Sequence, residues 1–198
     1  EEIAPLITRL VALLEQRQPG GGQIQHKVKL IALAARKVDD MVFRTVAGAL
    51  AEGRQLAFNY RGRNRSQATQ RKVSPLRLTW YKSNWYLDAW CHLRKSLRSF
   101  SLDRIDAPHR LDTPAQGVDD ATQTAHYASA YGIFSGAARH TAILRFTAHA
   151  ARWVADERWH SAQSGHFLID GSFELSVPYG NPTELVMDIL KYGPEIEV

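Results

Sequence analysis

The sequence predicts an α+β protein in which helices come first, a small five-stranded β-barrel follows, and alternating strands and helices end the chain. Three observations support this order. Apolar residues recur at helical spacing within residues 1–53. Short segments in which apolar and polar residues alternate, separated by turn residues, then occupy residues 54–111. Strand and helix patterns alternate again over residues 141–198.

The N-terminal helices are predicted from periodicity and from their end signals. Residues 3–17 place Ile and Leu at helical spacing, and Pro-Gly-Gly-Gly at 19–22 ends that helix, so residues 1–22 form a helix and a Gly-rich joint. Two linker helices are predicted over residues 23–53. One runs from about residue 24 to residue 36, and the next begins at Asp39 or Asp40 as N-cap and stops at Gly53.

The barrel is predicted from five strand patterns. The first covers residues 55–60, and a polar edge strand is predicted for 67–73. Pro75 then interrupts the pattern before residues 76–80. Lys-Ser-Asn at 82–84 predicts a short hairpin loop. The last two strands are predicted at residues 85–92 and 97–103. Five short strands joined by tight turns favour a small barrel over residues 54–111.

The remaining chain is predicted as a connector and a second domain. Residues 112–140 have weak helical content. The predicted order after them is strand 141–146, helix 148–155, strand 157–163, a strand at 167–169 or 173–177, and a helix. That helix has Asn181 as N-cap, Pro182 at its first position and Gly193 after its end. This order suits a ferredoxin-like fold over residues 141–198, with its last strand starting near Glu195.

Several classes of protein are disfavoured by composition and motifs. The single cysteine, Cys91, cannot form a disulfide within the chain, which favours a reducing, cytoplasmic setting. No apolar run approaches the roughly 20 residues of a membrane span. The eight histidines form no His-x-x-x-His pair, and no P-loop or nucleophile motif occurs. We therefore predict no metal, no cofactor and no enzymatic activity. Since the chain begins without methionine or a signal segment, we also expect a segment before residue 1.

Basic charge is concentrated in the predicted barrel. Residues 54–110 hold 13 Lys+Arg and 3 Asp+Glu, a net charge of +10. The flanking segments carry net charges of +1 over residues 1–53 and −6 over residues 111–198. A block of this kind attracts a polyanion. The alternative is a solvated surface that docks against the acidic C-terminal part.

Residues 84–105, NWYLDAWCHLRKSLRSFSLDRI, combine aromatic rings with guanidinium groups. Strand alternation assigns Trp85, Leu87, Ala89 and Cys91 to one face and Tyr86, Asp88, Trp90 and His92 to the other. In the next strand Arg98, Phe100, Leu102 and Arg104 are predicted to share a face. Arg binds phosphate bidentately and aromatic rings stack on bases, so the pattern favours single-stranded nucleic acid.

Structural roles compete with that interpretation. Trp85 and Leu87 are expected in the core, together with Phe58, Leu76, Leu78 and Trp80. Asp103 and Arg104 could be a structural ion pair, and the arginines at 61, 63 and 65 could serve solubility alone.

The sequence also resembles a known family. Trp85-Tyr86-Leu87, followed by RSFSLDRI at 98–105, is similar to the signature of the WYL domain of bacterial transcription regulators. KLIALAARKVDDMV at 29–42 resembles the helical stretch before that domain, and EGRQLAFNYRGR at 52–63 resembles its first strand and turn. VMDILKYGPEIEV at 186–198 resembles the C-terminal extension called WCX.

The resemblance implies an Sm-like five-stranded barrel and a ferredoxin-like WCX extension. In the family these form the effector-sensing region behind a winged helix-turn-helix that binds promoter DNA. No such motif is recognisable before residue 24, so we expect it to be missing from this chain. The resemblance further implies a homodimer and a nucleic-acid or nucleotide-like effector, with single-stranded DNA the leading candidate.

The ligand contacts are predicted in two groups. The family pattern implies that Tyr86, Arg98 and Arg104 contact the ligand, that Asp103 orients an arginine, and that Phe100 either contacts the ligand or packs in the barrel. The strand pattern adds Trp80, Tyr81, Trp90, His92 and Arg77. Two alternatives stay open, namely a pocket for a nucleotide-like small molecule and a dimerisation scaffold without a ligand.

Overall fold

The computed structural model of the chain describes residues 34–62, 67–128, 131–133 and 138–198. Two units are distinguished, Glu1–Ala35 and Arg36–Val198, and the helices and strands described below all belong to the second. The helix predicted at 3–17, the joint at 19–22 and most of the helix predicted at 24–36 lie outside the described residues. Residues 34–36 are not helical, so that helix does not reach its predicted end.

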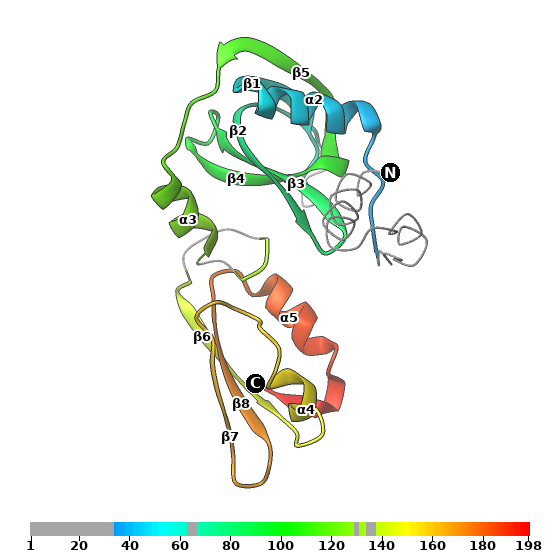
Figure 1. Ribbon diagram of the computed structural model, residues 1–198. Helices are drawn as coiled ribbons and strands as arrows, with labels where there is room; N and C mark the ends of the chain where they lie inside the picture. The colour runs from blue at the N-terminus through cyan, green and yellow to red at the C-terminus, as the bar shows by residue number, and fades with distance from the viewer. Residues whose placement is uncertain (1–33, 63–66, 129–130, 134–137) are drawn as a thin grey trace, which may run out of the picture. The chain divides into compact units, whose positions relative to one another are not determined.

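Helix α2 (Asp40–Ala51) begins where its N-cap signal predicted. The side chain of Asp39 accepts hydrogen bonds from the backbone N–H groups of Met41 and Val42, at 2.8 and 3.4 Å. After the helix, Gly53 adopts a φ of +59°, which glycine tolerates without steric cost. Val46 is fully buried on the face that packs against the strands, and α2 lies along them in Figure 1.

Five antiparallel strands form one sheet in the order β4-β3-β2-β1-β5. They are β1 (Arg54–Tyr60), β2 (Thr69–Tyr81), β3 (Asn84–Cys91), β4 (Ser96–Ser101) and β5 (Ile105–Pro114). The number of strands agrees with the prediction, but the residues that form them differ. The predicted strands at 67–73 and 76–80 are one strand, and β5 was not predicted.

Strand β2 contains Pro75 next to a β-bulge. The pairing of β2 with β3 shifts register between Pro75 and Arg77. At such a bulge the missing N–H of a proline interrupts no regular ladder bond. Strand β2 pairs with β1 through Thr69–Val73 and with β3 through Val73–Tyr81, so it lies between these two strands in the sheet. Residues 69–72, within the predicted edge strand at 67–73, pair with β1 alone.

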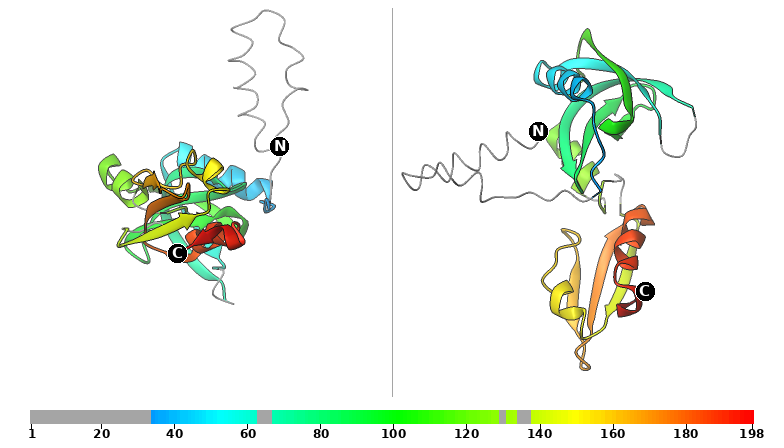
Figure 2. Two further views of the ribbon diagram at one scale, coloured as in Figure 1. Left: turned by 90° about the horizontal axis from the view of Figure 1, so that it is seen from below. Right: turned by 90° about the vertical axis from the view of Figure 1, so that its right-hand side faces the viewer.

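The sheet is strongly curved but is not closed into a barrel by hydrogen bonds (Figures 1 and 2). Strands β4 and β5 are its two edges and do not pair with each other in the described part of the chain. Its concave side holds a core that includes Phe58 and Leu87, as predicted, with Trp85 packed against it. Trp80 is 40% exposed, so its assignment to the core is wrong.

The connector contains α3 (Asp120–Ala128), and a second sheet follows it. Its elements are β6 (His140–Phe146), α4 (Ala151–Val154), β7 (Ser164–Phe167), β8 (Phe173–Tyr179), α5 (Pro182–Leu190) and β9 (Ile196–Glu197). The strands pair antiparallel in the order β7-β8-β6-β9. Val154 of α4 and Leu185 of α5 join the same core as Leu144 and Phe146 of β6, so both helices cover one face of this sheet.

Two predictions from the sequence, a helix cap and a strand, can be compared with the second sheet and its helices. Asn181 caps α5 as predicted, since its side chain accepts a hydrogen bond from the N–H of Thr183 at 2.9 Å. The strand predicted at 157–163 is wrong. The amide oxygen of Gln163 accepts hydrogen bonds from the N–H groups of Trp159 and His160, which holds that segment as a loop, and the strand begins at Ser164.

None of the helices in the described residues combines the length and apolar character that crossing a bilayer requires. The same residues contain no group of three or more His, Cys, Asp or Glu side chains that could hold a metal ion.

Candidate functional site

The strand register divides the predicted ligand contacts between two faces of the sheet. Ala89 pairs with Arg98 and Leu87 pairs with Phe100, so both β4 residues are on the side of the sheet that carries the core. Phe100 is buried there, whereas Arg98, on the edge strand, is exposed. Tyr86 pairs with Ser101 on the opposite, outer face. Tyr86 and Arg98 therefore do not face the same side, although the family pattern groups them.

A 3₁₀ turn, η2 (Leu102–Arg104), follows β4 and ends its alternation. Leu102 shares the core with Phe100, which agrees with the predicted face. Arg104 does not continue that face, because the 3₁₀ turn breaks the alternation of β4 before it. The hydroxyl of Ser101 donates to the carboxylate of Asp103. The backbone N–H of Arg61 donates to the carbonyl of Arg104 at 3.2 Å, which ties the turn to the end of β1. The turn thus holds Asp103 and Arg104 side by side.

Four side chains meet at this turn, and we call them the arginine cluster: Arg36, Tyr86, Asp103 and Arg104. The Arg36 Nη2 donates to the Tyr86 hydroxyl at 2.6 Å, and its guanidinium lies 5.6 Å from the centre of the Tyr86 ring. The Nε atoms of Arg36 and Arg104 lie 3.3 and 3.5 Å from the two carboxylate oxygens of Asp103. The backbone N–H of Arg36 donates to the Asn84 side chain at 2.8 Å, which fixes Arg36 beside the sheet.

The arginine cluster contains unsatisfied donors. The Nε atoms of Arg36 and Arg104 are both buried and have no hydrogen-bond partner among the described residues. Although each lies within ion-pair distance of Asp103, neither meets the geometry of a hydrogen bond. A buried donor without an acceptor costs roughly 1–3 kcal/mol. Two such donors on neighbouring guanidinium groups are suited to an oxyanion with several acceptor oxygens.

A depression of about 350 Å³ lies beside the cluster. It is lined by Asn59, Arg61, Ala68, Asp103, Arg104, Ile105 and Asp106. The lining contains two arginines and two aspartates, so it combines attraction for an anion with two fixed negative charges. Of the lining residues, Asp103 and Arg104 also belong to the arginine cluster.

Arg77 belongs to a separate network around a buried carboxylate. Asp88 is 1% exposed and accepts hydrogen bonds from Arg77 at 3.1 and 3.2 Å, from Thr79 at 2.7 Å and from Ser99 at 2.5 Å. The Arg77 guanidinium lies 4.6 Å from the centre of the Tyr127 ring of α3. Burial raises the pKa of Tyr127, and the charge of Asp88 adds to the effect. Arg77 therefore joins the connector helix to the outer face of the sheet.

His92 and Trp90 lie further along the same outer face. The His92 Nε2 lies within hydrogen-bond distance of the Ser74 hydroxyl, at 2.9 Å, and the same hydroxyl accepts a hydrogen bond from the backbone N–H of Gln116 at 2.8 Å. Burial lowers the pKa of His92, and Lys72 lowers it further. Trp90 is half-buried and pairs across the strands with residues 74 and 97. No contact in the described residues joins either ring to the arginine cluster.

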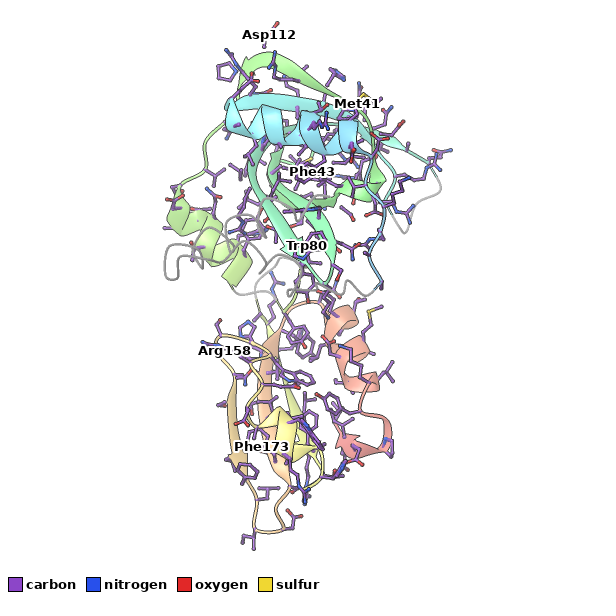
Figure 3. The ribbon with its side chains drawn as sticks, turned by 45° about the vertical axis from the view of Figure 1, so that its right-hand side comes forward. Met41, Phe43, Trp80, Asp112, Arg158 and Phe173 are labelled. Atoms are coloured by element: carbon purple, nitrogen blue, oxygen red, sulfur yellow. The ribbon has the colours of Figure 1, made fainter. Side chains whose placement is uncertain are left out.

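The remaining predicted contacts are dispersed. Phe100 is buried and packs edge-on against Phe58. Trp80, near the end of the β2–β3 hairpin in Figure 3, stacks edge-on against Trp85 with ring centres 5.0 Å apart. Tyr81 is half-buried, burial raises its pKa, and its ring lies 5.4 Å from the Lys82 Nζ.

Arg98 is exposed and makes no side-chain hydrogen bond or ion pair within the described ranges. Of the ten predicted site residues, the structure brings three together in the arginine cluster: Tyr86, Asp103 and Arg104.

Sequence reasoning missed Arg36, because it was assigned to the end of a predicted helix. A usable signal was present. An N-cap at Asp39 has extended backbone, so the residues just before it need not be helical, and Arg36 is free to approach the sheet. Asp88 was also missed as a network centre, although its place between Tyr86 and Trp90 is unusual for a carboxylate in a central strand position.

Comparisons with known proteins agree with this architecture. A family model described as the WYL domain matches residues 41–110, and one described as the WCX domain matches residues 138–198. The chain is similar to Protein PafC of Mycobacterium leprae, with 24% identity over 153 residues, and to Protein PafC of Mycobacterium tuberculosis, with 26% identity over 153 residues. Each alignment covers 77% of this chain, and 46% and 47% of the respective relative. The chain thus spans about half the length of these curated relatives.

Two solved structures are also similar. Proteasome accessory factor B/C (PafBC) of Arthrobacter aurescens is 24% identical, with 90% of this chain and 26% of that chain covered and a TM-score of 0.40. A CRISPR Cas-related protein is 9% identical, with 78% of this chain and 45% of that chain covered and a TM-score of 0.47. From the two family models, the chain belongs to the WYL-domain family, with a WYL domain at residues 41–110 followed by a WCX domain at residues 138–198.

Proposed function

We propose that this chain is the effector-sensing region of a transcriptional regulator and that its effector is single-stranded DNA. The observation that carries the proposal is the pair of buried, unsatisfied Nε donors of Arg36 and Arg104. The net charge of +10 over residues 54–110 supports a polyanionic ligand. Membership of the WYL-domain family supports the regulatory role.

In this proposal a backbone phosphate binds between Arg36 and Arg104. Its oxygens accept from the two Nε–H groups, and Tyr86 contributes its hydroxyl and ring at the same place. Arg98, on the exposed edge strand β4, is proposed to contact a longer strand beyond this site. The affinity should then grow with oligonucleotide length until both regions are occupied.

The proposal extends to the rest of the regulator. Promoter DNA would be bound by a winged helix-turn-helix N-terminal to this region, and the protein would act as a homodimer in the cytoplasm. We further propose an Sm-like barrel within residues 54–111 and a ferredoxin-like fold within residues 141–198. The curved five-stranded sheet and the strand order β7-β8-β6-β9 support these assignments.

A nucleotide-like small molecule is the second candidate effector. The depression of about 350 Å³ beside the arginine cluster is within the size range of small-ligand sites, roughly 300–1,000 Å³. Such a ligand would place its phosphate at the same two arginines. Its affinity would not depend on chain length, which separates it from a strand.

The third interpretation, a dimerisation scaffold whose arginines pair with the acidic C-terminal part, has less support. Arg36 and Arg104 pair with Asp103, Arg77 pairs with Asp88, and Arg110 pairs with Glu52. The carboxylates that pair with these arginines all precede residue 111. One lysine of the basic block, Lys82, does pair with the C-terminal part, with its Nζ 2.9 Å from Asp188. Neighbouring carboxylates therefore neutralise only part of the basic block, which leaves most of its net charge available to a ligand.

The test is fluorescence anisotropy of the chain with labelled oligo(dT) from one to about fifteen nucleotides, at several salt concentrations. We expect affinity to rise with length and to fall with salt. Arg104→Ala should weaken binding and reduce the slope of log K against log salt by about 0.7, the value for one lost phosphate contact on a single strand.

Arg145→Ala is the matched control. Arg145 is a half-exposed arginine of β6 that pairs with Asp170, so its loss changes the net charge equally without touching the arginine cluster. Equal effects of Arg104→Ala and Arg145→Ala would reject the site. Absence of binding at any length and at low salt would reject single-stranded DNA, and nucleotides would then be screened.

A further inference from the structure

Asp103 is shared by two guanidinium groups in the arginine cluster. Its side chain is 12% exposed, and its two oxygens lie 3.3 Å from the Nε of Arg36 and 3.5 Å from the Nε of Arg104. Charge-assisted hydrogen bonds between such groups are usually about 2.7–2.9 Å long. One carboxylate thus neutralises two cations without satisfying the Nε–H of either.

A hydrogen bond from the preceding strand also fixes the carboxylate of Asp103. The hydroxyl of Ser101 donates to the oxygen that faces Arg36. Ser101 is itself buried and paired with Tyr86 across the strands. Asp103 therefore occupies a defined position, and a second anion cannot approach both Nε atoms without meeting its negative charge.

We infer that Asp103 is a built-in counter-ion that an anionic ligand has to displace or outcompete in order to bind. This inference rests on the proposed function, because it concerns the regulation of the same site. A phosphate offers more acceptor oxygens than a carboxylate and can serve both Nε–H groups. A ligand therefore has to bind strongly enough to replace Asp103, and with a weakly charged ligand both arginines stay paired with Asp103.

A counter-ion role and an orienting role of Asp103 predict opposite effects of its neutralisation on ligand affinity. If Asp103 positions an arginine for the ligand, its neutralisation weakens binding. If Asp103 competes with the ligand, its neutralisation strengthens binding, because two guanidinium groups are released from their internal partner and a like charge is removed.

The chain offers a matched control in Asp106. It lines the same depression, is exposed, and within the described residues makes no ion pair with Arg36 or Arg104. Asp103→Asn and Asp106→Asn change the net charge by the same amount at nearly the same place. Only the first removes the carboxylate that the two arginines share.

The experiment measures the affinity of wild type, Asp103→Asn and Asp106→Asn for labelled oligo(dT) at two salt concentrations, with the fold checked by circular dichroism. We expect Asp103→Asn to bind roughly tenfold more tightly than wild type. Asp106→Asn should change the affinity by no more than about twofold, the effect of net charge through screening solvent. Asp103→Glu, which keeps the charge, should not bind more tightly than wild type.

The outcomes separate the two proposals. Binding by Asp103→Asn but not by wild type supports the counter-ion role, although single-stranded DNA is then rejected as the effector of the wild-type protein. If wild type binds and Asp103→Asn binds equally well or more weakly, the counter-ion role is overturned and the proposed function stands. The counter-ion role is also overturned if Asp106→Asn gains as much affinity as Asp103→Asn. If neither wild type nor Asp103→Asn binds, the proposed function fails and the inference fails with it. Asp103→Ser supplies a second neutral variant if Asp103→Asn does not fold.

Discussion

Asp88 illustrates how a single residue stabilises this protein. A carboxylate that is 1% exposed in the middle of β3 is tolerated because Arg77, Thr79 and Ser99 all donate to it. The three donors come from β2 and β4, so the network joins the strands on either side of β3. Since the guanidinium of Arg77 also lies over Tyr127, the same network reaches the connector helix.

Asp88→Ala is expected to lower the free energy of unfolding by about 3 kcal/mol. The reason is that the hydrogen bonds from three donor side chains to a charged acceptor are lost and the Arg77 cation loses its carboxylate partner. Urea denaturation monitored by circular dichroism measures the change. Asp112→Ala is the control, since Asp112 is exposed on β5 (Figure 3) and should change the value by less than about 0.5 kcal/mol. Equal costs for the two variants would show that the network adds nothing.

At the scale of elements, α2 is the helix that covers the core of the first sheet. Val42, Val46 and Ala49 recur at helical spacing and are buried, whereas Met41 on the opposite side is 67% exposed (Figure 3). The helix is short, so its stability depends on this packing and on the Asp39 cap more than on intrinsic propensity. The turn η2 has a comparable role for the site, because it ends β4 and aligns Asp103 with Arg104.

Val46→Ala is expected to cost about 2 kcal/mol of folding free energy, from two buried methyl groups and the cavity left behind. Met41→Ala, in the same helix, should stay within about 0.5 kcal/mol of wild type. Thermal and urea unfolding of both variants test the difference. A large effect of Met41→Ala would mean that the exposed side of α2 packs against a partner in solution.

For the whole molecule, histidine ionisation predicts how stability depends on pH. Burial lowers the pKa of both His92 and His126 from the ordinary value near 6.5, Lys72 adds to the effect at His92, and Asp88 opposes it at His126. In the unfolded chain both side chains take up a proton near pH 6.5. In the folded chain they resist protonation until the pH is lower, so the unfolded state binds more protons in that window.

The free energy of unfolding should therefore be largest above pH 6.5 and should decrease as the pH falls from about 7.5 to 5.5. Urea denaturation at the two pH values measures the difference. His92→Gln should make the decrease smaller, because one of the two groups no longer titrates. A stability that is unchanged or higher at pH 5.5 would contradict this assignment.

The sequence by itself determined the α+β class, an N-cap for α2 at Asp39 or Asp40, and the N-cap of α5 at Asn181. These features depend on local interactions, such as caps and periodic burial, that a short window of residues contains. The resemblance to the WYL and WCX domains likewise came from contiguous residues, and the family models confirm it. Tyr86, Asp103 and Arg104 were named for the same reason.

Only the tertiary structure decided which of the predicted residues meet. Strand register separates Tyr86 from Arg98, and the turn η2 takes Arg104 off the face that alternation assigned to it. Arg36 reaches Tyr86 from 50 positions away in the sequence, and Pro75 lies inside a continuous strand because a bulge accommodates it. Contacts between distant segments depend on pairing register and on local breaks in alternation. Neither is encoded in the periodicity of a single strand, which explains why the chemistry of the site could be predicted and its geometry could not.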